Sequence, residues 1–440
     1  MTPPGPRTRS PLGSLNEFRH NRLAFLRSLP QYGDITFMRL GREPVYTLHH
    51  PDLIQQALVT QAHQFQKLRL TRNLFGRVVK SDVALRQTPA WKQRREAVQS
   101  TLHAQKIEQY AATMADLTRQ QMSGWFAPID VFHEMRHLTL LIVARTLFGS
   151  DLSSEVQSIM SATGIMQEQG SKRFNTPFAL PLWIPTPHNV RVKGAVSTLD
   201  RVVQGMIDDY MAENDSPRSD ITALLLQMAP ETLTLPNIRE EMISLLMSGH
   251  ETTATALSWL WCLLAEHSDV EARMIAEIDT ALQGRSATPA ALPDLPYAQA
   301  VVKETLRLYP PSWVISRKAV EDVCIGGCEI PRHATVFISP YSLHHDERWF
   351  DQPNMFKPER FLEGEINRGD IHRFAYLPFS IGPRKCIGSA FATLEILLIA
   401  VTVLQRMRLV RMSHEAIIPE ALITLRPRQP IIVSAVTREA

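Results

Sequence analysis

The sequence predicts a mainly α-helical protein with a smaller β-rich region. Helical apolar periodicity recurs in long stretches, the longest of which covers residues 236–267. Two other regions, 33–49 and 313–340, instead contain short alternating apolar runs that are typical of strands. With 440 residues, of which 44% are hydrophobic, the chain has enough apolar material for a large core.

The elements follow from these patterns in chain order. Region 33–49 is predicted to form a β-hairpin that turns at Gly41-Arg42-Glu43-Pro44, and Gly326-Gly327 marks a second hairpin turn. Helix 138–148 is apolar on nearly all sides, which predicts burial. The helices expected are 16–29, one opened by Pro51, 91–122, 138–148, 152–170, 190–213, 236–267, 269–283 and 297–309.

The domain organisation is predicted to be simple. Residues 1–14 are rich in Pro, Arg and Ser and are expected to be flexible. No repeat or linker divides residues 15–440, which are predicted to form a single catalytic domain. Residues 174–187 contain four prolines but are apolar, and we interpret them as a lid over an apolar cavity.

Composition excludes several classes of protein. The net charge of +3 gives no support for nucleic acid as the main partner. Four cysteines are too few for a disulfide framework and fit a reducing compartment, so a cytoplasmic, bacterial-type protein is expected. No run approaches the ~18–20 apolar residues of a transmembrane helix.

A loop at 379–388 carries a cysteine, Cys386, to the start of an apolar run predicted to be a helix over 387–404. A thiolate there would face free N–H groups and the positive end of the helix dipole, which stabilise an anion. Gly382 and Gly388 remove side-chain bulk, so a large flat group can approach the sulfur. Such a thiolate suits the axial position of haem iron. The alternative for a lone cysteine is a buried structural residue.

The loop fits the pattern F-x-x-G-x-R-x-C-x-G, from Phe379 to Gly388. This pattern resembles the haem-binding signature of the cytochrome P-450 family, with every key position filled. The resemblance implies the cytochrome P-450 fold, with haem b between the long central helix and the cysteine loop, and Cys386 as the iron ligand. It also implies a monooxygenase that inserts one atom of O2 into an apolar substrate.

The two propionates of haem need cationic partners. The resemblance places Trp91 and Arg95, which share a helix face, beside a propionate; the residues alone also allow a core tryptophan next to a solvated arginine. Arg317 and Arg384 occupy family positions that supply further positive charge. The cofactor-binding residues implied by the resemblance are Trp91, Arg95, Gly249, Arg317, Phe379, Gly382, Arg384, Cys386 and Gly388.

The central helix contains the polar stretch Ser248-Gly249-His250-Glu251-Thr252-Thr253. Glycine loosens a helix and threonine can bond to a carbonyl one turn earlier, so we expect a local widening that admits a small ligand. The zinc motif H-E-x-x-H begins at His250, but its second histidine is missing. The stretch is similar to the family's [A/G]-G-x-[D/E]-T motif, which implies that Thr252 hydrogen-bonds bound oxygen and Glu251 relays protons.

Glu304 and Arg307 lie three residues apart on a predicted helix and can form an ion pair. Such pairs are commonly exposed, but apolar flanking residues predict burial here, with Arg360 as a further partner. These residues resemble the E-x-x-R and P-E-R-F elements of the family, which lock the core behind the haem. Glu304, Arg307 and Arg360 are therefore predicted to be structural.

The predicted substrate pocket is chiefly aliphatic and aromatic. This favours a hydrophobic, lipid-like or terpenoid substrate over a charged one, and the sequence does not choose between a fatty acid, a terpenoid and a polyketide. The predicted lining residues are Leu74, Phe75, Phe178, Leu246, Trp313, Val314, Ile315 and Ile423.

No electron-transfer module is recognised in the sequence, so electrons are expected from a separate ferredoxin- or flavodoxin-type donor. Lys92, Arg94 and Lys385 form part of a basic docking patch or an ordinary solvated surface. We expect a monomer. The alternatives are a peroxide-driven haem peroxygenase, a non-catalytic haem sensor, and a zinc hydrolase built on His250 and Glu251.

Overall fold

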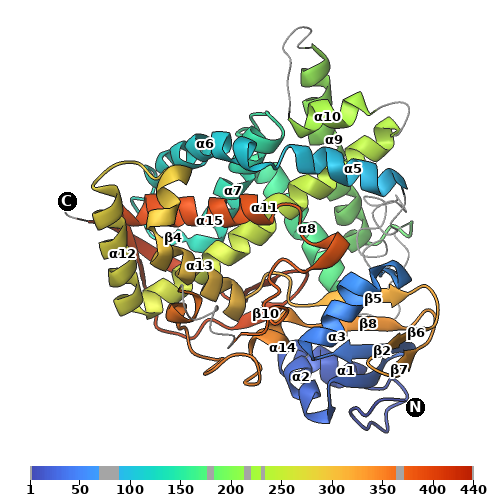
Figure 1. The fold of residues 1–440 in the computed structure, drawn as a ribbon. Helices are drawn as coiled ribbons and strands as arrows, with labels where there is room; N and C mark the ends of the chain where they lie inside the picture. Colours follow the sequence, from blue (N-terminus) through green and yellow to red (C-terminus); the bar gives the residue numbers. More distant parts are fainter. Residues whose placement is uncertain are drawn as a thin grey trace.

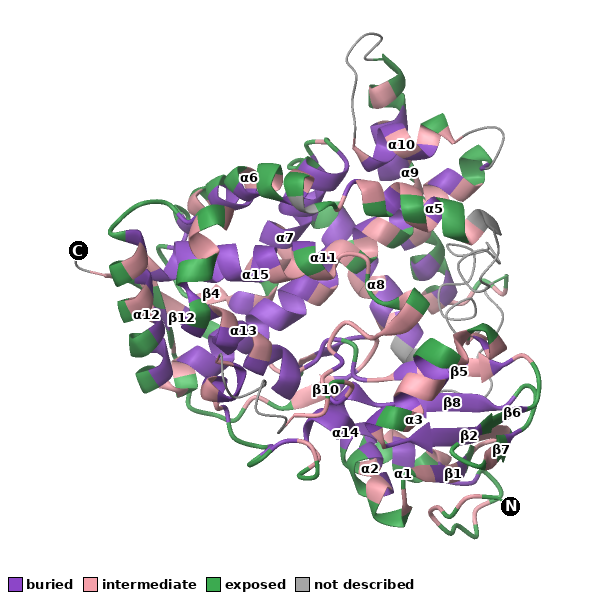
Figure 2. Cartoon of the chain, viewed as in Figure 1, coloured by how far each residue is buried: buried purple, intermediate pink, exposed green. Residues whose placement is uncertain are grey.

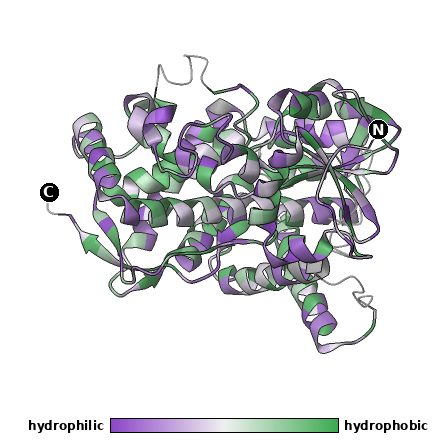
Figure 3. Ribbon diagram, turned by 90° about the horizontal axis from the view of Figure 1, so that it is seen from below, coloured by the Kyte–Doolittle hydropathy of each residue, from purple (hydrophilic) through white to green (hydrophobic). Residues whose placement is uncertain are grey.

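The computed structural model describes residues 2–68, 89–175, 183–212, 220–228, 233–362 and 371–438. A helical region and a smaller β-rich region lie side by side, and the two termini are at opposite ends of the molecule (Figures 1 and 3). The helices are α1 (Leu15–His20), α2 (Arg22–Ser28), α3 (Pro51–Gln55), α5 (Pro89–Ser100), α6 (Ala104–Met122), α7 (Val131–Leu147), α8 (Val156–Asn175), α9 (Pro187–Ala212), α10 (Ile221–Gln227), α11 (Leu235–Glu266), α12 (Ser268–Leu282), α13 (Pro296–Leu308), α14 (Pro340–His344) and α15 (Ser389–Leu404).

The strands form one larger sheet and several small ones. The five-stranded sheet has the order β1-β2-β8-β5-β3, in which β2 and β8 are parallel and the other pairs antiparallel. The strands are β1 (Ile35–Leu40), β2 (Glu43–Leu48), β3 (Phe65–Lys67), β4 (Ile129–Asp130), β5 (Ile315–Ala319), β6 (Val323–Ile325), β7 (Cys328–Ile330), β8 (Thr335–Ile338), β9 (Met407–Arg411), β10 (Pro419–Ala421), β11 (Leu425–Pro427) and β12 (Ile432–Thr437). The mainly helical prediction is therefore confirmed.

The core of the helical region surrounds α11. Helices α7, α11 and α15 are buried along most of their length, whereas α6 and α12 alternate between buried and exposed residues (Figure 2). Burial of these apolar side chains is the main driving force for this packing. The described residues include no helix that is both long enough and apolar enough to cross a membrane.

Two predicted helices are each divided in the structure. The expected helix 16–29 breaks at Asn21, whose extended backbone ends α1 and whose side-chain Oδ1 accepts a 3.0 Å hydrogen bond from Ala24 N, capping α2. The expected helix 91–122 is divided into α5 and α6, because residues 101–103 leave the helical conformation. The hairpin of β1 and β2 and that of β6 and β7 form where the sequence predicts them.

The N-terminal segment, predicted to be flexible, makes regular contacts with β1. Phe37 N–H donates to Pro4 O over 3.0 Å, and Ser14 N–H donates to Arg39 O over 2.8 Å. The Ser14 side chain is buried. These hydrogen bonds place parts of residues 2–14 against the edge strand β1, which offers unpaired backbone groups, whereas the sequence predicts a flexible segment.

Candidate active site

The cysteine loop is held by short backbone hydrogen bonds. Cys386 N–H donates to Phe379 O over 2.9 Å, and Lys385 N–H donates to Gly382 O over 3.0 Å around the 3₁₀ turn Gly382–Arg384. Helix α15 begins at Ser389, two residues later than predicted. Cys386 therefore precedes the first turn of the helix, close to its N-terminus.

The two loop glycines serve different purposes. Gly382 has a φ of +75°, and a Cβ atom there would collide with the carbonyl oxygen of Leu58. Its role is thus to let the loop pack against the chain near Leu58, which corrects the interpretation that it clears space beside the sulfur. A Cβ atom at Gly388 would have Cys386 Sγ as its neighbour at 4.0 Å, so Gly388 does leave room beside the sulfur.

The Cys386 thiol is accessible from a cavity of about 370 Å³. Burial raises its pKa, while the Gly388 N–H and the positive charges of Arg95 and Lys67 act in the opposite direction. A cation bound at the sulfur would favour the deprotonated form strongly.

Apolar atoms and a few polar groups line this cavity. Thr252, Thr253 and Ala256 of α11 lie on one wall, and the segment that includes Leu377 and Phe379 contributes to the cysteine wall. Val314 and Ile315 line the cavity as predicted. The cavity thus places the central helix and the cysteine loop around one space.

Positive charge gathers at one edge of the cavity. Lys67, Arg317 and Arg384 all line it. Lys67 of β3 lies directly opposite Arg317 of β5 in the sheet, an arrangement in which like charges repel. Burial, and next the charges of Arg384 and Arg317, lower the pKa of Lys67 to about 8. Burial together with neighbouring arginines also lowers the pKa of Arg317 and that of Arg384 to about 10.

Trp91 and Arg95 lie next to this cationic cluster (Lys67, Arg317 and Arg384). The Arg384 guanidinium carbon is 4.6 Å from the Trp91 ring centroid, and that of Arg95 is 5.6 Å from it. Arg95 also donates to Lys385 O over 2.6 Å, which ties α5 to the cysteine loop. Lys67 could not be predicted from the sequence, because only the pairing of β3 with β5 brings it to this site.

These features fit haem. A set of neighbouring, mutually repelling cations, of which Arg317 is buried, calls for anionic partners, which the two propionates would provide. The apolar walls suit a flat macrocycle, and the thiol of Cys386 is a ligand type that haem iron accepts. The residues present therefore match each chemical part of the cofactor.

On α11, Thr252 lines the Cys386 cavity, and its Oγ1 donates to Ser248 O over 2.8 Å. Gly249 does not line it. A Cβ atom at Gly249 would lie 3.1 Å from Val143 Cγ2, so this glycine lets α11 approach α7 closely. Its predicted role in cofactor binding is corrected on that ground: the glycine faces a neighbouring helix.

Glu251 is buried and engaged in an ion pair. Its Oε2 accepts from Arg136 Nε of α7 over 3.0 Å, and His250 Nε2 lies 3.8 Å away. Arg136 also donates to Met160 O and to Thr163 Oγ1 of α8 over 2.8 and 2.9 Å. The carboxylate is therefore tied to α7 and α8, and it does not line the Cys386 cavity. Sequence reasoning did not identify Arg136, which is 115 residues away in the chain.

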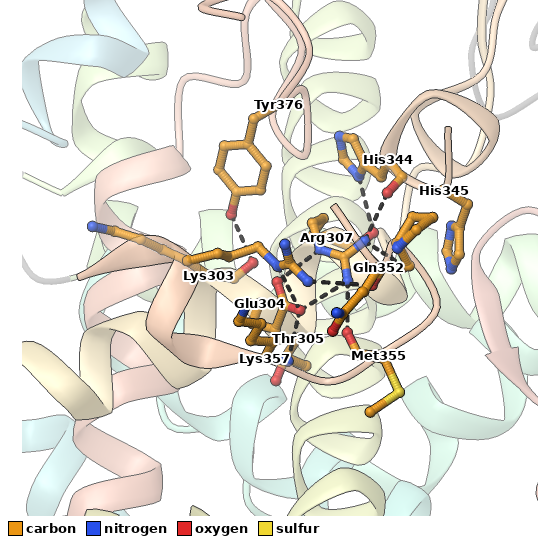
Figure 4. A network of polar contacts seen from close by, with 12 residues as sticks. Lys303, Glu304, Thr305, Arg307, His344, His345, Gln352, Met355, Lys357 and Tyr376 are labelled. Carbon is orange, nitrogen blue, oxygen red and sulfur yellow. Dashed lines mark hydrogen bonds and ion pairs between the residues drawn. The ribbon is translucent and has the colours of Figure 1, made fainter. Parts of the chain in front are cut away.

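The structure brings the predicted structural residues together in a buried network (Figure 4). Arg307 donates from Nε and Nη2 to the two oxygens of Glu304 over 2.7 and 2.8 Å. Arg360 Nε and Lys357 N–H donate to Glu304 Oε1 over 3.0 and 2.9 Å. Glu304 thus accepts four hydrogen bonds and neutralises two buried guanidinium groups.

This network connects α13 with the chain that leads to Cys386. The neutral His344 ring donates from Nδ1 to Arg307 O over 3.0 Å and accepts at Nε2 from Leu377 N–H over 2.8 Å. Tyr376 donates to Lys303 O over 3.0 Å. Burial and the Arg307 charge lower the pKa of His344 well below its usual range, which keeps the ring neutral and able to accept.

The remaining pocket predictions have mixed outcomes. Ile423 lines a second cavity of about 240 Å³. Leu246 is fully buried in the helical core, and Trp313 is buried with its Nε1 donating to Leu422 O over 2.9 Å. Neither residue is part of the described lining of these two cavities, in contrast to the prediction. Helical periodicity does not reveal which partner a buried face meets. Leu74, Phe75, Phe178 and half of the lid segment 174–187, namely residues 176–182, lie outside the described residues.

The predicted basic docking patch is smaller than expected. Arg94 is buried and pairs with Glu241 over 3.2 Å, so it cannot contribute to a solvated surface. Lys92 and Lys385 are exposed.

The fold and the site together define a mainly helical protein with a cavity that fits a flat anionic cofactor beside a cysteine sulfur. The chain belongs to the cytochrome P450 family, whose family model matches residues 3–434. It is thus a haem-thiolate monooxygenase, which excludes the non-catalytic sensor and the zinc hydrolase.

The chain is similar along most of its length to several curated proteins. It is 35% identical over 394 residues to the "Cyclooctatin synthase" of Streptomyces melanosporofaciens, covering 88% of this chain and 85% of that protein. It is 33% identical over 398 residues to the "Cyclooctat-9-en-7-ol 5-monooxygenase" of the same organism, with the same coverage. It is 30% identical over 414 residues to the "Pentalenene oxygenase" of Streptomyces avermitilis, covering 92% and 91% of the two chains.

Proposed function

We propose that this protein inserts one oxygen atom from O2 into a terpenoid, with haem b as its cofactor. The main observation behind this proposal is that Cys386 and Thr252 line the same cavity. A ligand atom for the cofactor and a polar group of the central helix therefore face one space. The names of the three relatives support a terpenoid substrate. We further propose that the protein acts as a single-domain cytoplasmic monomer that receives electrons from a separate ferredoxin- or flavodoxin-type donor.

In this proposal the cationic cluster and its neighbours orient the cofactor. Arg95, Arg317 and Arg384, with Lys67, would bind the propionates, and Trp91 would pack beside them. Phe379 and Gly388 would shape the space at the Cys386 sulfur. When bound, haem supplies the iron at which dioxygen is activated.

Proton delivery is assigned to α11. Thr252 Oγ1 donates to Ser248 O and can accept a proton or hydrogen bond from the cavity side. Glu251 faces Arg136, so it must exchange that partner or act through an intervening group before it can transfer a proton toward Thr252. The apolar walls would exclude bulk water from the reaction.

A turnover assay tests the proposal. The holoprotein would be supplied with NADPH, a ferredoxin reductase, a ferredoxin and a panel of terpenoids, under isotopically labelled dioxygen. We expect one labelled oxygen atom in the product. Product formed without label, or oxidation of fatty acids alone, would contradict the proposal.

Thr252→Ala tests the assigned role of the hydroxyl. We expect the variant to consume O2 but to release mainly peroxide. Thr255→Ala is the matched control, because Thr255 also donates to the carbonyl four residues earlier, over 2.8 Å, yet is fully buried away from both cavities. If the fraction of consumed O2 that appears in the product is the same in Thr252→Ala and in the control, the role assigned to the Thr252 hydroxyl is refuted. Turnover with peroxide alone, at the rate seen with O2 and electrons, would instead favour the peroxygenase alternative.

A further inference from the structure

The second cavity adjoins the Cys386 cavity and is chemically different from it. Thr252, Pro311 and Ser312 line both spaces, so a ligand can extend from one to the other. The second cavity is also lined by polar residues of α8, α11 and the turn between β10 and β11, namely Gln167, Ser244, Ser248 and Thr424. A substrate that reaches this cavity meets hydroxyl and amide groups.

The polar residues on α11 form a continuous row. Ser244, Ser248 and Thr252 are spaced by four residues, so they lie one above the other on the same helix face. With a rise of about 1.5 Å per residue, Ser248 and Ser244 lie roughly 6 and 12 Å along the axis from Thr252. A group that binds near Ser244 is therefore well separated from the reacting carbon near Thr252.

Two buried polar atoms from other lining residues of this cavity lack hydrogen-bond partners within the described part of the chain. Gln167 is 4% exposed and its Oε1 has no partner, and Thr424 is 5% exposed and its Oγ1 has none. Burying such groups without a hydrogen bond is unfavourable. A ligand hydroxyl satisfies both types of group, because it can donate to the amide oxygen and either donate to or accept from the threonine hydroxyl.

The charge of this cavity favours a neutral ligand. Among the described lining residues Glu251 is charged, and Arg136 already neutralises it. The described lining contains no Lys or Arg that could pair with a carboxylate. A fatty acid would therefore place its carboxylate without a cationic partner if its head group occupied this cavity.

We propose that the second cavity binds a hydroxyl group already present on the substrate, so that the substrate is a terpenoid alcohol and not the parent hydrocarbon. This inference rests on the proposed function and specifies its substrate class. The reaction that supplies the substrate must then be one that leaves a hydroxyl on the skeleton, such as a hydroxylation or a cyclisation that ends with water. Gln167 and Thr424 are the specificity-determining residues.

Spectral titration of the holoprotein tests this proposal through the change in haem spin state on binding. The probes are two pairs that differ in their hydroxyl groups, cedrol with cedrane and sclareol with labdane, together with hexadecanoic acid. We expect each alcohol to bind roughly 3- to 10-fold more tightly than its hydrocarbon, as one or two net hydrogen bonds would give. In Gln167→Leu and in Thr424→Val, the ratio of alcohol affinity to hydrocarbon affinity should fall at least 3-fold, while the affinity for the hydrocarbon is retained.

Thr402→Val is the matched control for Thr424→Val. Thr402 is likewise buried with an unpartnered Oγ1, but it lies on α15 and lines neither cavity, so the alcohol preference should persist. Ser244→Ala provides a conservative second variant, and the thiolate-type spectrum of the carbon monoxide adduct verifies each holoprotein.

The outcomes separate this inference from the proposed function. Equal binding of alcohol and hydrocarbon by the unaltered protein, or a preference that survives Gln167→Leu, Thr424→Val and Ser244→Ala, would overturn the inference and leave the terpenoid proposal standing. If hexadecanoic acid binds and no terpenoid does, the proposed substrate class and this inference both fail.

Discussion

Replacing Glu304 removes the centre of the buried network behind the cysteine loop. The Glu304 side chain is fully buried and accepts two hydrogen bonds from Arg307 and one from Arg360. In Glu304→Ala both guanidinium groups stay buried without a carboxylate. Arg307 keeps three backbone carbonyl acceptors and Arg360 keeps two, which satisfy hydrogen bonds but not charge.

The expected loss of stability is large. Breaking a buried ion pair by removing one partner costs roughly 3–5 kcal/mol, whereas whole domains are stable by about 5–15 kcal/mol. Because His344 connects Arg307 O to Leu377 N–H, the disturbance should reach the segment that precedes Cys386. We therefore expect the variant to retain little haem. Glu304→Gln, which preserves the shape and one acceptor oxygen, should lose less stability than Glu304→Ala.

Urea unfolding measures the loss, and the absorption spectrum measures the haem retained. Glu359→Ala is the control, because Glu359 belongs to the same 3₁₀ turn as Arg360 but pairs with a half-exposed Arg273 over 2.8 Å. An exposed pair of this kind contributes about 0–1 kcal/mol. If Glu304→Ala unfolds at the same urea concentration as Glu359→Ala and holds a full complement of haem, the proposed structural role is wrong.

Two further predictions concern cavity shape and pH. A Cβ atom at Gly170 of α8 would collide with Ile423 Cδ1 at the second cavity, so Gly170→Ala should weaken cedrol binding several-fold in the spectral titration. The double variant Gly170→Ala/Ile423→Val lacks Cδ1 but keeps the tighter-than-usual Cγ1 contact, so it should restore part of the binding. Unchanged binding in the single variant would disprove this account. Burial lowers the pKa of His49 from 6.5 to about 4 and that of His345 from 6.5 to about 3. Below pH 6.5 the unfolded chain therefore takes up protons at these histidines while the native protein does not, so the contribution of the two neutral rings to stability is fully present above pH 6.5 and is lost as the pH falls. Between pH 7 and pH 5, each of these two histidines should lower the free energy of unfolding, measured in urea, by about 2 kcal/mol. In His345→Asn this loss should be smaller by the contribution of His345. The same pH dependence of stability in the variant and in the unaltered protein would contradict the prediction.

The sequence was sufficient to predict those parts of the site whose residues lie close together in the chain. The Cys386 loop could be predicted because its turn residues, arginine and cysteine lie within ten consecutive positions. The pairing of Glu304 with Arg307 could be predicted for the same reason, since three residues on a helix place them together.

Features that depend on distant contacts could not be predicted. Lys67 joins the cationic cluster only through its register with Arg317, and Arg136 reaches Glu251 from another helix. The glycines were recognised as special but assigned to the wrong neighbours, because the close approaches of Gly249 to Val143 and of Gly382 to Leu58 exist only in the folded chain. Composition suggested an apolar pocket, whereas the side chains that line the second cavity include several polar ones.

The absorption of the reduced carbon monoxide adduct tests the central claim most directly. The haem-loaded protein should show the strongly red-shifted band of a thiolate ligand, and Cys386→His should replace it with the histidine-type band. A histidine-type band in the active, unaltered protein, or a thiolate-type band that persists in Cys386→His, would contradict the assignment of Cys386 as the ligand of the iron.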